Sequence, residues 1–128
     1  MAAYAVRDEA TLGSLPLDIS SESAGAVAVY RIVGKVDALT SPQLVAAVGS
    51  AIAGGTPWIV YDMREVAYIS SAGLRGILVI AKQAKAANGG LAMFGLQPAV
   101  DEVFAISGFH DIIPIATDET QARARLGK

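Results

Sequence analysis

The stretch VAYISSAGLRG, residues 66–76, reads as the end of an apolar strand that runs directly into a helix. Two adjacent serines, Ser70 and Ser71, stand at the junction. Capping a helix needs only one serine oxygen, which accepts a bond from a free backbone N–H of the first turn. The pair therefore has two interpretations: a helix cap alone, or a cap beside a serine with a functional role.

Strand and helix patterns alternate on both sides of this junction. Strands are expected at 15–20, 25–36, 57–63, 91–96 and 112–116, and helices at 40–55, 71–87, 97–108 and 118–126. The sequence SSESAG, residues 20–25, is expected to form the turn between the first two strands. This order predicts a single α/β domain with a mostly parallel central sheet of four to five strands, about four helices, and the first strands antiparallel at one edge.

Composition limits what such a domain can do. The 128 residues are 53% hydrophobic, contain no cysteine and one histidine, and carry a formal net charge of −2. Disulfides, thiolate chemistry and a histidine-rich metal site are therefore excluded, and no cofactor is expected. The charge disfavours nucleic acid as a partner. No apolar run approaches the roughly 18 residues of a membrane span, so membrane insertion is not expected.

The ends of the chain add two expectations. Residues 1–13 are weakly patterned and read as a loosely structured extension, which leaves 14–128 as the domain. The N-terminus lacks the basic start and apolar block of a signal peptide, so a cytoplasmic location is expected.

The position of the two serines fits a regulatory role about as well as it fits a simple cap. In parallel α/β sheets, ligands and regulatory groups collect in the loops that leave the carboxyl ends of strands. A phosphate on Ser71 would add about −1.5 to −2 charges. The helix dipole and the free N–H groups of a helix N-terminus tolerate such an anion. Ser71 is therefore the candidate phosphoacceptor, with Ser70 as the alternate.

Helical spacing separates two faces of the junction helix. The stripe expected to face the core consists of Leu74, Ile77, Leu78, Ala81 and Ala84. The stripe expected to face solvent consists of Ser71, Arg75, Val79 and Lys82. Beside it lie Ala72 and Gly76, which are small enough for another chain to approach closely. Spacing alone fits an ordinary solvated helix face better than a docking site.

A family resemblance favours the docking site. VAYISSAGLRGILVIAKQAKAANGGLAMFGL, residues 66–96, strongly resembles the STAS domain of bacterial anti-sigma factor antagonists. VYRIVGKVDALTSPQL, residues 29–44, and AVDEVFAISGFHDIIPI, residues 99–115, resemble further segments of that family. Together the resemblance covers residues 15–126.

The family pattern D-S-[ST]-G-L, aligned on Gly73 and Leu74, puts the phosphorylated serine at Ser71. Ser70 then replaces the family aspartate, which removes one negative charge beside the acceptor. The resemblance also implies that Asp37 is the acidic residue of the neighbouring loop. It implies a partner-facing set made of Asp37, Thr40, Ser70, Ala72, Gly73, Arg75, Gly76, Val79 and Lys82. For Thr40, a role as N-cap of its helix is an equally good interpretation.

What the resemblance implies about function is partner switching. The unmodified antagonist would bind an anti-sigma factor that is also a serine kinase of the GHKL type. Phosphorylation would end the complex, and a PP2C-type phosphatase would restore the antagonist. No catalytic activity of its own is expected.

Three alternatives carry less support from the residues. A receiver domain with Asp62 as phosphoacceptor would need an acid pair after the first strand and a lysine after the last, and neither is present. A hydrolase that uses His110 beside Asp111 lacks a G-x-S-x-G nucleophile elbow. The third alternative, a STAS subunit of a lipid-transport system, stays open.

Overall fold

The computed structural model describes residues 17–128, so the predicted extension at residues 1–13 lies outside the described part of the chain. The elements in chain order are β1 (Asp18–Ala24), β2 (Val27–Val36), α3 (Ser41–Ala53), β3 (Trp58–Ile69), α4 (Ser71–Ala86), β4 (Gly90–Phe94), α5 (Pro98–Ile106), the 3₁₀ turn η1 (Phe109–Asp111), β5 (Ile115–Ala116) and α6 (Glu119–Arg125).

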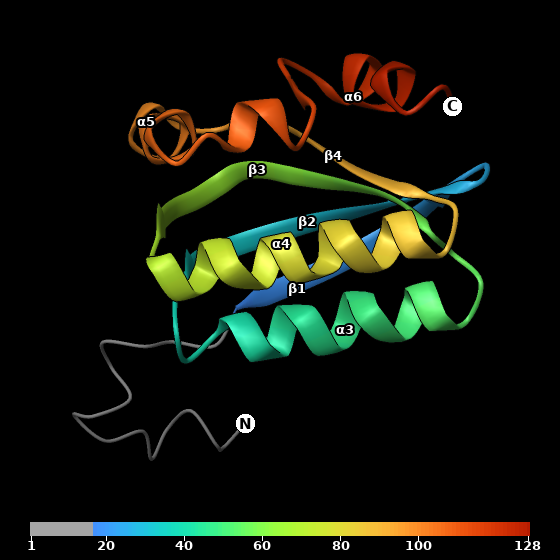
Figure 1. Ribbon diagram of the computed structural model, residues 1–128, viewed down its shortest axis with the longest axis horizontal. Helices are drawn as coiled ribbons and strands as arrows, with labels where there is room; N and C mark the ends of the chain where they lie inside the picture. The colour runs from blue at the N-terminus through green and yellow to red at the C-terminus, as the bar shows by residue number, and fades with distance from the viewer. Residues whose placement is uncertain (1–16) are drawn as a thin grey trace.

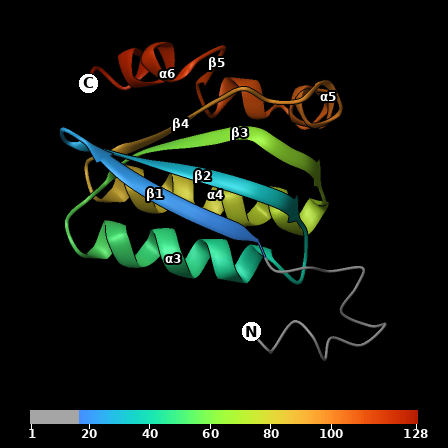
Figure 2. The ribbon, with the colours of Figure 1, turned by 180° about the vertical axis from the view of Figure 1, so that it is seen from behind.

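The strands form one sheet in the order β1-β2-β3-β4-β5. β1 pairs antiparallel with β2, and the remaining neighbours pair parallel, which confirms the predicted α/β architecture. Helices α3 and α4 lie side by side on one face, while α5 and α6 lie beyond β3 and β4 (Figure 1). Seen from behind, β1 and β2 lie in front of α3 and α4 (Figure 2).

The central strands are buried on both faces, because helices pack on each side of the sheet. The larger core joins α3 and α4 to the sheet through residues such as Ile59 and Tyr61 of β3, and it also takes in Val100 and Phe104 of α5. The smaller core consists of Val27, Val60, Ala92, Phe94 and Ala122, the last of which belongs to α6. This double burial explains why β3 begins as a continuous apolar run rather than an alternating one.

β1 extends through the segment that was predicted to be a turn. Residues 20–24 pair in register with β2, and only Gly25 and Ala26 form the turn. Gly25 has φ +66°, a left-handed conformation that two-residue hairpin loops use and that glycine adopts without strain. The polar composition misled the prediction, because β1 is largely exposed and has few apolar positions to reveal its pattern.

β3 continues to Ile69, beyond the predicted end at Met63, and so joins the VAYI segment into one strand of 12 residues. Its ladder with β2 contains two register shifts, one between Asp62 and Glu65 and one between Val66 and Tyr68. Each shift inserts one extra residue into β3, as in a β-bulge. The shifts allow Met63, Val66 and Ile69, spaced three apart, to enter the same core.

The last strand is shorter than predicted. Residues 112–116 were expected to pair, but only Ile115 and Ala116 do so. The chain before them turns through η1, where the N–H of Ile113 donates to the carbonyl of Phe109 at 2.9 Å. Pro114 has no N–H to donate, and Ile112 is exposed.

The face that α4 buries matches the predicted stripe at Ile77 and Ala84 but is rotated from it elsewhere. Gly73, Gly76, Ile77, Ile80 and Ala84 are buried, whereas the predicted core residues Leu74, Leu78 and Ala81 are only half-buried. The reason is that α4 packs against α3 as well as the sheet. A Cβ on Gly76 would collide with the Ser41 hydroxyl of α3.

Gly73 brings the first turn of α4 against the end of β2. A Cβ at this position would collide with the carbonyl oxygen of Val36 and lie 2.9 Å from Cγ1 of Ile69. A backbone carbonyl held in a sheet cannot rotate away as a flexible side chain can. We therefore expect Gly73→Ala to lower the free energy of unfolding by about 1–3 kcal/mol, measured by urea denaturation.

Gly49→Ala in α3 is the matched control. There a Cβ would lie 3.2 Å from Oε1 of Gln83, a side chain that can adjust. Alanine also has the higher helix propensity, so this variant should stay within about 1 kcal/mol of the original chain. Equal stability of the two variants would show that the close approach of Gly73 to the carbonyl of Val36 does not exclude a Cβ.

Candidate functional site

Ser70 and Ser71 have different structural roles at the junction of β3 and α4. Ser70 is the N-cap, and its hydroxyl oxygen accepts a hydrogen bond from the N–H of Gly73 at 3.1 Å. Its own N–H donates to the carbonyl of Val36 at 3.0 Å. Ser71 is the first residue of the helix and is exposed to solvent. One serine therefore forms the cap, and the other presents its side chain at the surface.

Asp37 and Thr40 close the loop between β2 and α3 by a reciprocal exchange. The N–H of Asp37 donates to Oγ1 of Thr40 at 2.9 Å, and the N–H of Thr40 donates to Oδ1 of Asp37 at 3.0 Å. This is the geometry of a capping box, with threonine in place of the usual Glu or Gln. The Thr40 hydroxyl in turn donates to the carbonyl of Lys35 at 2.6 Å.

The same bonds set the charge of Asp37. Burial of the carboxyl raises the pKa of Asp37, but the hydrogen bonds from Thr40 and Leu39 and the nearby charge of Lys35 outweigh it. The pKa of Asp37 therefore lies below its ordinary value. Asp37 places one negative charge beside the N-terminus of α4.

An open hollow of about 600 Å³ lies between this loop and the start of α4. It is lined by Asp37, Ala38, Leu39, Tyr68, Ser70, Ser71, Ala72 and Arg75. A second hollow of about 290 Å³ shares Ala38, Ala72 and Arg75 with the first and continues between α3 and α4 as far as Val79.

The rim of the hollows carries large apolar side chains that are exposed to solvent. Leu39 is 70% exposed, Tyr68 is 49% exposed and Val79 is 46% exposed. Clustered exposed apolar side chains commonly mark sites of protein–protein contact. We call this region the apical surface and define it by Leu39, Tyr68, Ser71, Ala72, Arg75 and Val79.

Some residues of the predicted partner-facing set lie elsewhere. Thr40 is 3% exposed, and its side chain is used inside the loop, although it occupies the N-cap position of α3. Gly73 and Gly76 are buried against β2 and α3, although Gly76 also lines the smaller hollow. The small size predicted to admit another chain at Gly76 instead admits α3 of the same chain. Lys82 is exposed on α4 but lines neither hollow.

Sequence reasoning missed Leu39 and Tyr68, the two most exposed apolar residues of the apical surface. A signal for each was present. Leu39 is the one large apolar residue in the loop DALT, and Tyr68 directly precedes the buried Ile69, so it faces the opposite side of the strand.

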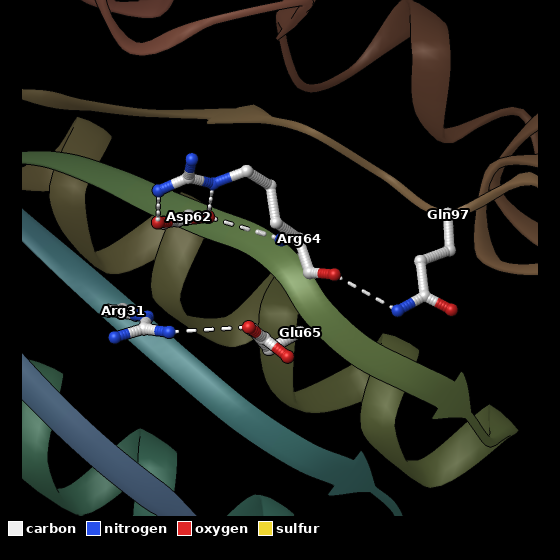
Figure 3. A network of polar contacts seen from close by, with 5 residues as sticks. All are labelled: Arg31, Asp62, Arg64, Glu65 and Gln97. Atoms are coloured by element: carbon white, nitrogen blue, oxygen red, sulfur yellow. Dashed lines mark hydrogen bonds and ion pairs between the residues drawn. The ribbon is translucent and has the colours of Figure 1, made fainter.

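Asp62, the phosphoacceptor of the receiver alternative, is buried and bound to Arg64 through both carboxylate oxygens (Figure 3). Oδ1 accepts from the Arg64 N–H at 3.1 Å and from Nε at 2.9 Å, and Oδ2 accepts from a terminal guanidinium nitrogen at 2.7 Å. The Gln97 amide donates to the carbonyl of Arg64 at 3.0 Å, which ties the start of α5 to β3. Asp62 anchors this network, and its engaged oxygens disfavour phosphoryl chemistry there.

The histidine of the hydrolase alternative contacts a different acid from its sequence neighbour. Nε2 of His110 lies 2.9 Å from Oδ1 of Asp101 in α5. Both side chains are about half exposed, and neither lines the hollows beside Ser71. The geometry offers no arrangement of His110 with either serine of the junction.

Comparison with known proteins identifies the class to which this fold and surface belong. A family model described as STAS domain matches residues 18–122. A Bordetella bronchiseptica protein named as the anti-sigma factor antagonist BtrV is 41% identical over 91 residues, which cover 71% of this chain and 78% of that protein. The chain therefore belongs to the STAS domain family and, within it, to the anti-sigma factor antagonists.

Solved structures share the fold at low sequence identity. An anti-sigma factor antagonist of Thermotoga maritima has a TM-score of 0.81 at 16% identity, over 86% of this chain and 95% of that one. The antagonist SpoIIAA in its unphosphorylated form has a TM-score of 0.73 at 23% identity, over 87% and 98%. Its phosphorylated form from Bacillus has a TM-score of 0.66 at 24% identity, over 84% and 98%.

In the part of the chain that the structure describes, no helix combines the length and the apolar character needed to cross a bilayer.

Thr40→Val tests the structural role of the loop exchange. Valine matches threonine in shape but can neither accept from the N–H of Asp37 nor donate to the carbonyl of Lys35. We expect a loss of about 1–3 kcal/mol in the free energy of unfolding, because two partly buried polar groups lose their partner. Thr40→Ser keeps the hydroxyl and should lose less than about 1 kcal/mol. Valine and serine variants of equal stability would contradict this role.

Asp62→Asn tests the Arg64 network through pH. Burial raises the pKa of Asp62, but the hydrogen bonds and charge of Arg64, together with Arg31, outweigh it and lower the pKa below the ordinary 3.8. The ion pair therefore stabilises the fold above pH 3.8, and this stabilisation is lost as the pH falls through the lowered value.

Chemical denaturation as a function of pH provides the measurement. The Asn variant should be less stable by about 1–2 kcal/mol at pH 7, and the difference should shrink below pH 4. Glu65→Gln, which breaks the exposed pair with Arg31, is the control and should cost less than about 0.5 kcal/mol. A pH-independent difference for Asp62→Asn would exclude the ion pair as its cause.

Proposed function

We propose that this chain is a phosphorylatable protein-interaction switch. In its unmodified form it binds, through the apical surface, an anti-sigma factor that is also a serine kinase of the GHKL type. The kinase transfers the γ-phosphoryl group of ATP to the Ser71 oxygen, and ADP and the hydroxyl proton leave. The modified chain is released, and a PP2C-type phosphatase restores the hydroxyl. The chain itself catalyses no step and acts in the cytoplasm.

The observation that carries the proposal is the exposed hydroxyl of Ser71 among exposed apolar side chains. Leu39, Tyr68 and Val79 offer a partner the apolar area that a stable contact needs. Ser71 lines the larger hollow together with Leu39, Tyr68 and Arg75. A group attached to its oxygen would enter any interface formed there.

A phosphate on Ser71 is compatible with the fold of the free chain but not with a desolvated interface. At the first residue of α4, the phosphate would meet free N–H groups and the positive end of the helix dipole. In a desolvated contact the same dianion would lose its water, and one neighbouring cation could balance only half of its charge. Burial of an uncompensated charge costs several kcal/mol, which corresponds to roughly 10³-fold in affinity.

The structure supports Ser71 over Ser70 as the acceptor. The Ser70 oxygen is occupied as the helix cap, and Ser70 is only partly exposed. It fills the position of the family aspartate with another residue that caps helices well, so the missing carboxylate leaves the start of α4 intact. Among relatives, SpoIIAA has been solved in unphosphorylated and phosphorylated forms, which supports a phosphorylation switch in a chain of the same fold.

Three substitutions at Ser71 test the switch. Wild-type chain and Ser71→Asp are first used in parallel to capture the partner from native lysate, and the purified partner is then titrated against each variant by calorimetry. Ser71→Asp should weaken binding by roughly 10²-fold, because it buries a single negative charge. Ser71→Asn has the same shape without the charge and should bind like the wild type.

Phosphate transfer provides the second readout. With the partner kinase and ATP, intact-mass measurement should show one added phosphate on the wild type and on Ser70→Ala, and none on Ser71→Ala. A phosphate on Ser71→Ala would assign the acceptor elsewhere. Equal affinities of Ser71→Asp and Ser71→Asn would show that charge at this position does not control binding.

A further inference from the structure

We propose that the phosphate on Ser71 forms an ion pair with Arg75, one helical turn along α4, and that this pair occupies the larger hollow of the apical surface. The inference rests on the proposed phosphorylation of Ser71 and concerns what the phosphate does once it is there. Phosphorylation would then both add negative charge and withdraw Arg75 from the surface that a partner meets.

The spacing of the two residues is the one that brings side chains together. Ser71 and Arg75 are at positions i and i+4 of α4, about 6 Å apart along the helix axis. Both are exposed, and both line the hollow of about 600 Å³. An acidic group on the N-terminal side of a cation at this spacing is the favourable orientation. A guanidinium can also bind two phosphate oxygens at once.

Arg75 is available for this contact. Among residues 17–128, no carboxylate forms an ion pair with Arg75, whereas Arg31 and Arg64 pair with Glu65 and Asp62. The first turn of α4 contains no acidic residue that would compete for it. The negative group that lines the same hollow is Asp37, which is held by backbone N–H groups of its own loop.

The negative charge of Asp37 also favours an orientation of the phosphate toward Arg75. A dianion on Ser71 would be repelled by Asp37 and attracted by Arg75, so the phosphate should lean along α4 and away from the β2–α3 loop. The resulting pair would lie in the hollow that Leu39 and Tyr68 also line. The guanidinium donors that face solvent in the unmodified chain would then be engaged within the molecule.

The test needs neither the partner nor the kinase, because phosphoserine can be placed at position 71 during translation. ³¹P NMR then measures the second pKa of the phosphate, which is ordinarily about 6. Arg75 should lower this pKa, since the cation favours the dianion. Arg75→Ala should therefore raise the pKa of the phosphate by about 0.2–0.4 units relative to the wild type at low salt.

Lys82→Ala is the matched control. Lys82 lies on the same solvent-facing stripe but about 16 Å from Ser71 along the helix, so its removal should change the pKa of the phosphate much less than Arg75→Ala does. The effect of Arg75→Ala should also shrink in 1 M salt. Equal values for the wild type and Arg75→Ala, or equal shifts for Arg75→Ala and Lys82→Ala, would overturn the ion pair.

The failure of this inference is distinguishable from failure of the proposed function. If the partner kinase does not modify Ser71, the switch is wrong, yet the NMR comparison still reports on Arg75. If Ser71 is modified but the pKa of the phosphate ignores Arg75, the switch stands without the ion pair.

Discussion

The N–H of Ser70 donates to the carbonyl of Val36, and the missing side chain of Gly73 lets α4 begin directly against that same strand end. This contact joins two parallel strands and a helix within a few residues. It fixes where the cap ends and the exposed face of α4 begins, and so places the Ser71 hydroxyl outside the fold. The apical surface exists because the backbone beneath it is packed this tightly.

Local features of the sequence were enough to predict the elements around this contact. Pro42 and Pro98 in first turns, glycines near helix ends, and short apolar runs between them predicted the alternation of strands and helices. The boundaries that went wrong belong to elements without a clear period. β1 is polar and exposed, and the final strand shrinks to two residues because η1 and Pro114 use up its length.

The candidate site was harder to predict, because a helical wheel gives faces but does not say what covers them. Gly76 has the spacing of a surface residue beside Ser71, yet α3 packs against it. Thr40 has two interpretations in the sequence, a cap or a partner contact; it occupies the N-cap position of α3, but its side chain accepts from the N–H of Asp37 rather than from the helix. Leu39 and Tyr68 are brought beside Ser71 by the ends of two different strands, a relation that only the sheet register defines.

The two extra residues in β3 mean that the number of residues in this strand determines where α4 begins. Removing one residue between Asp62 and Ser70 would therefore have one of two results. Either one of the two bulges is lost, or the alternation of side chains turns Ile69 outward and Tyr68 inward and draws the start of α4 back by about 3.3 Å. Insertions and deletions should therefore be accommodated in the loops at the far edge of the sheet, while the stretch that leads to the serines keeps its residue count.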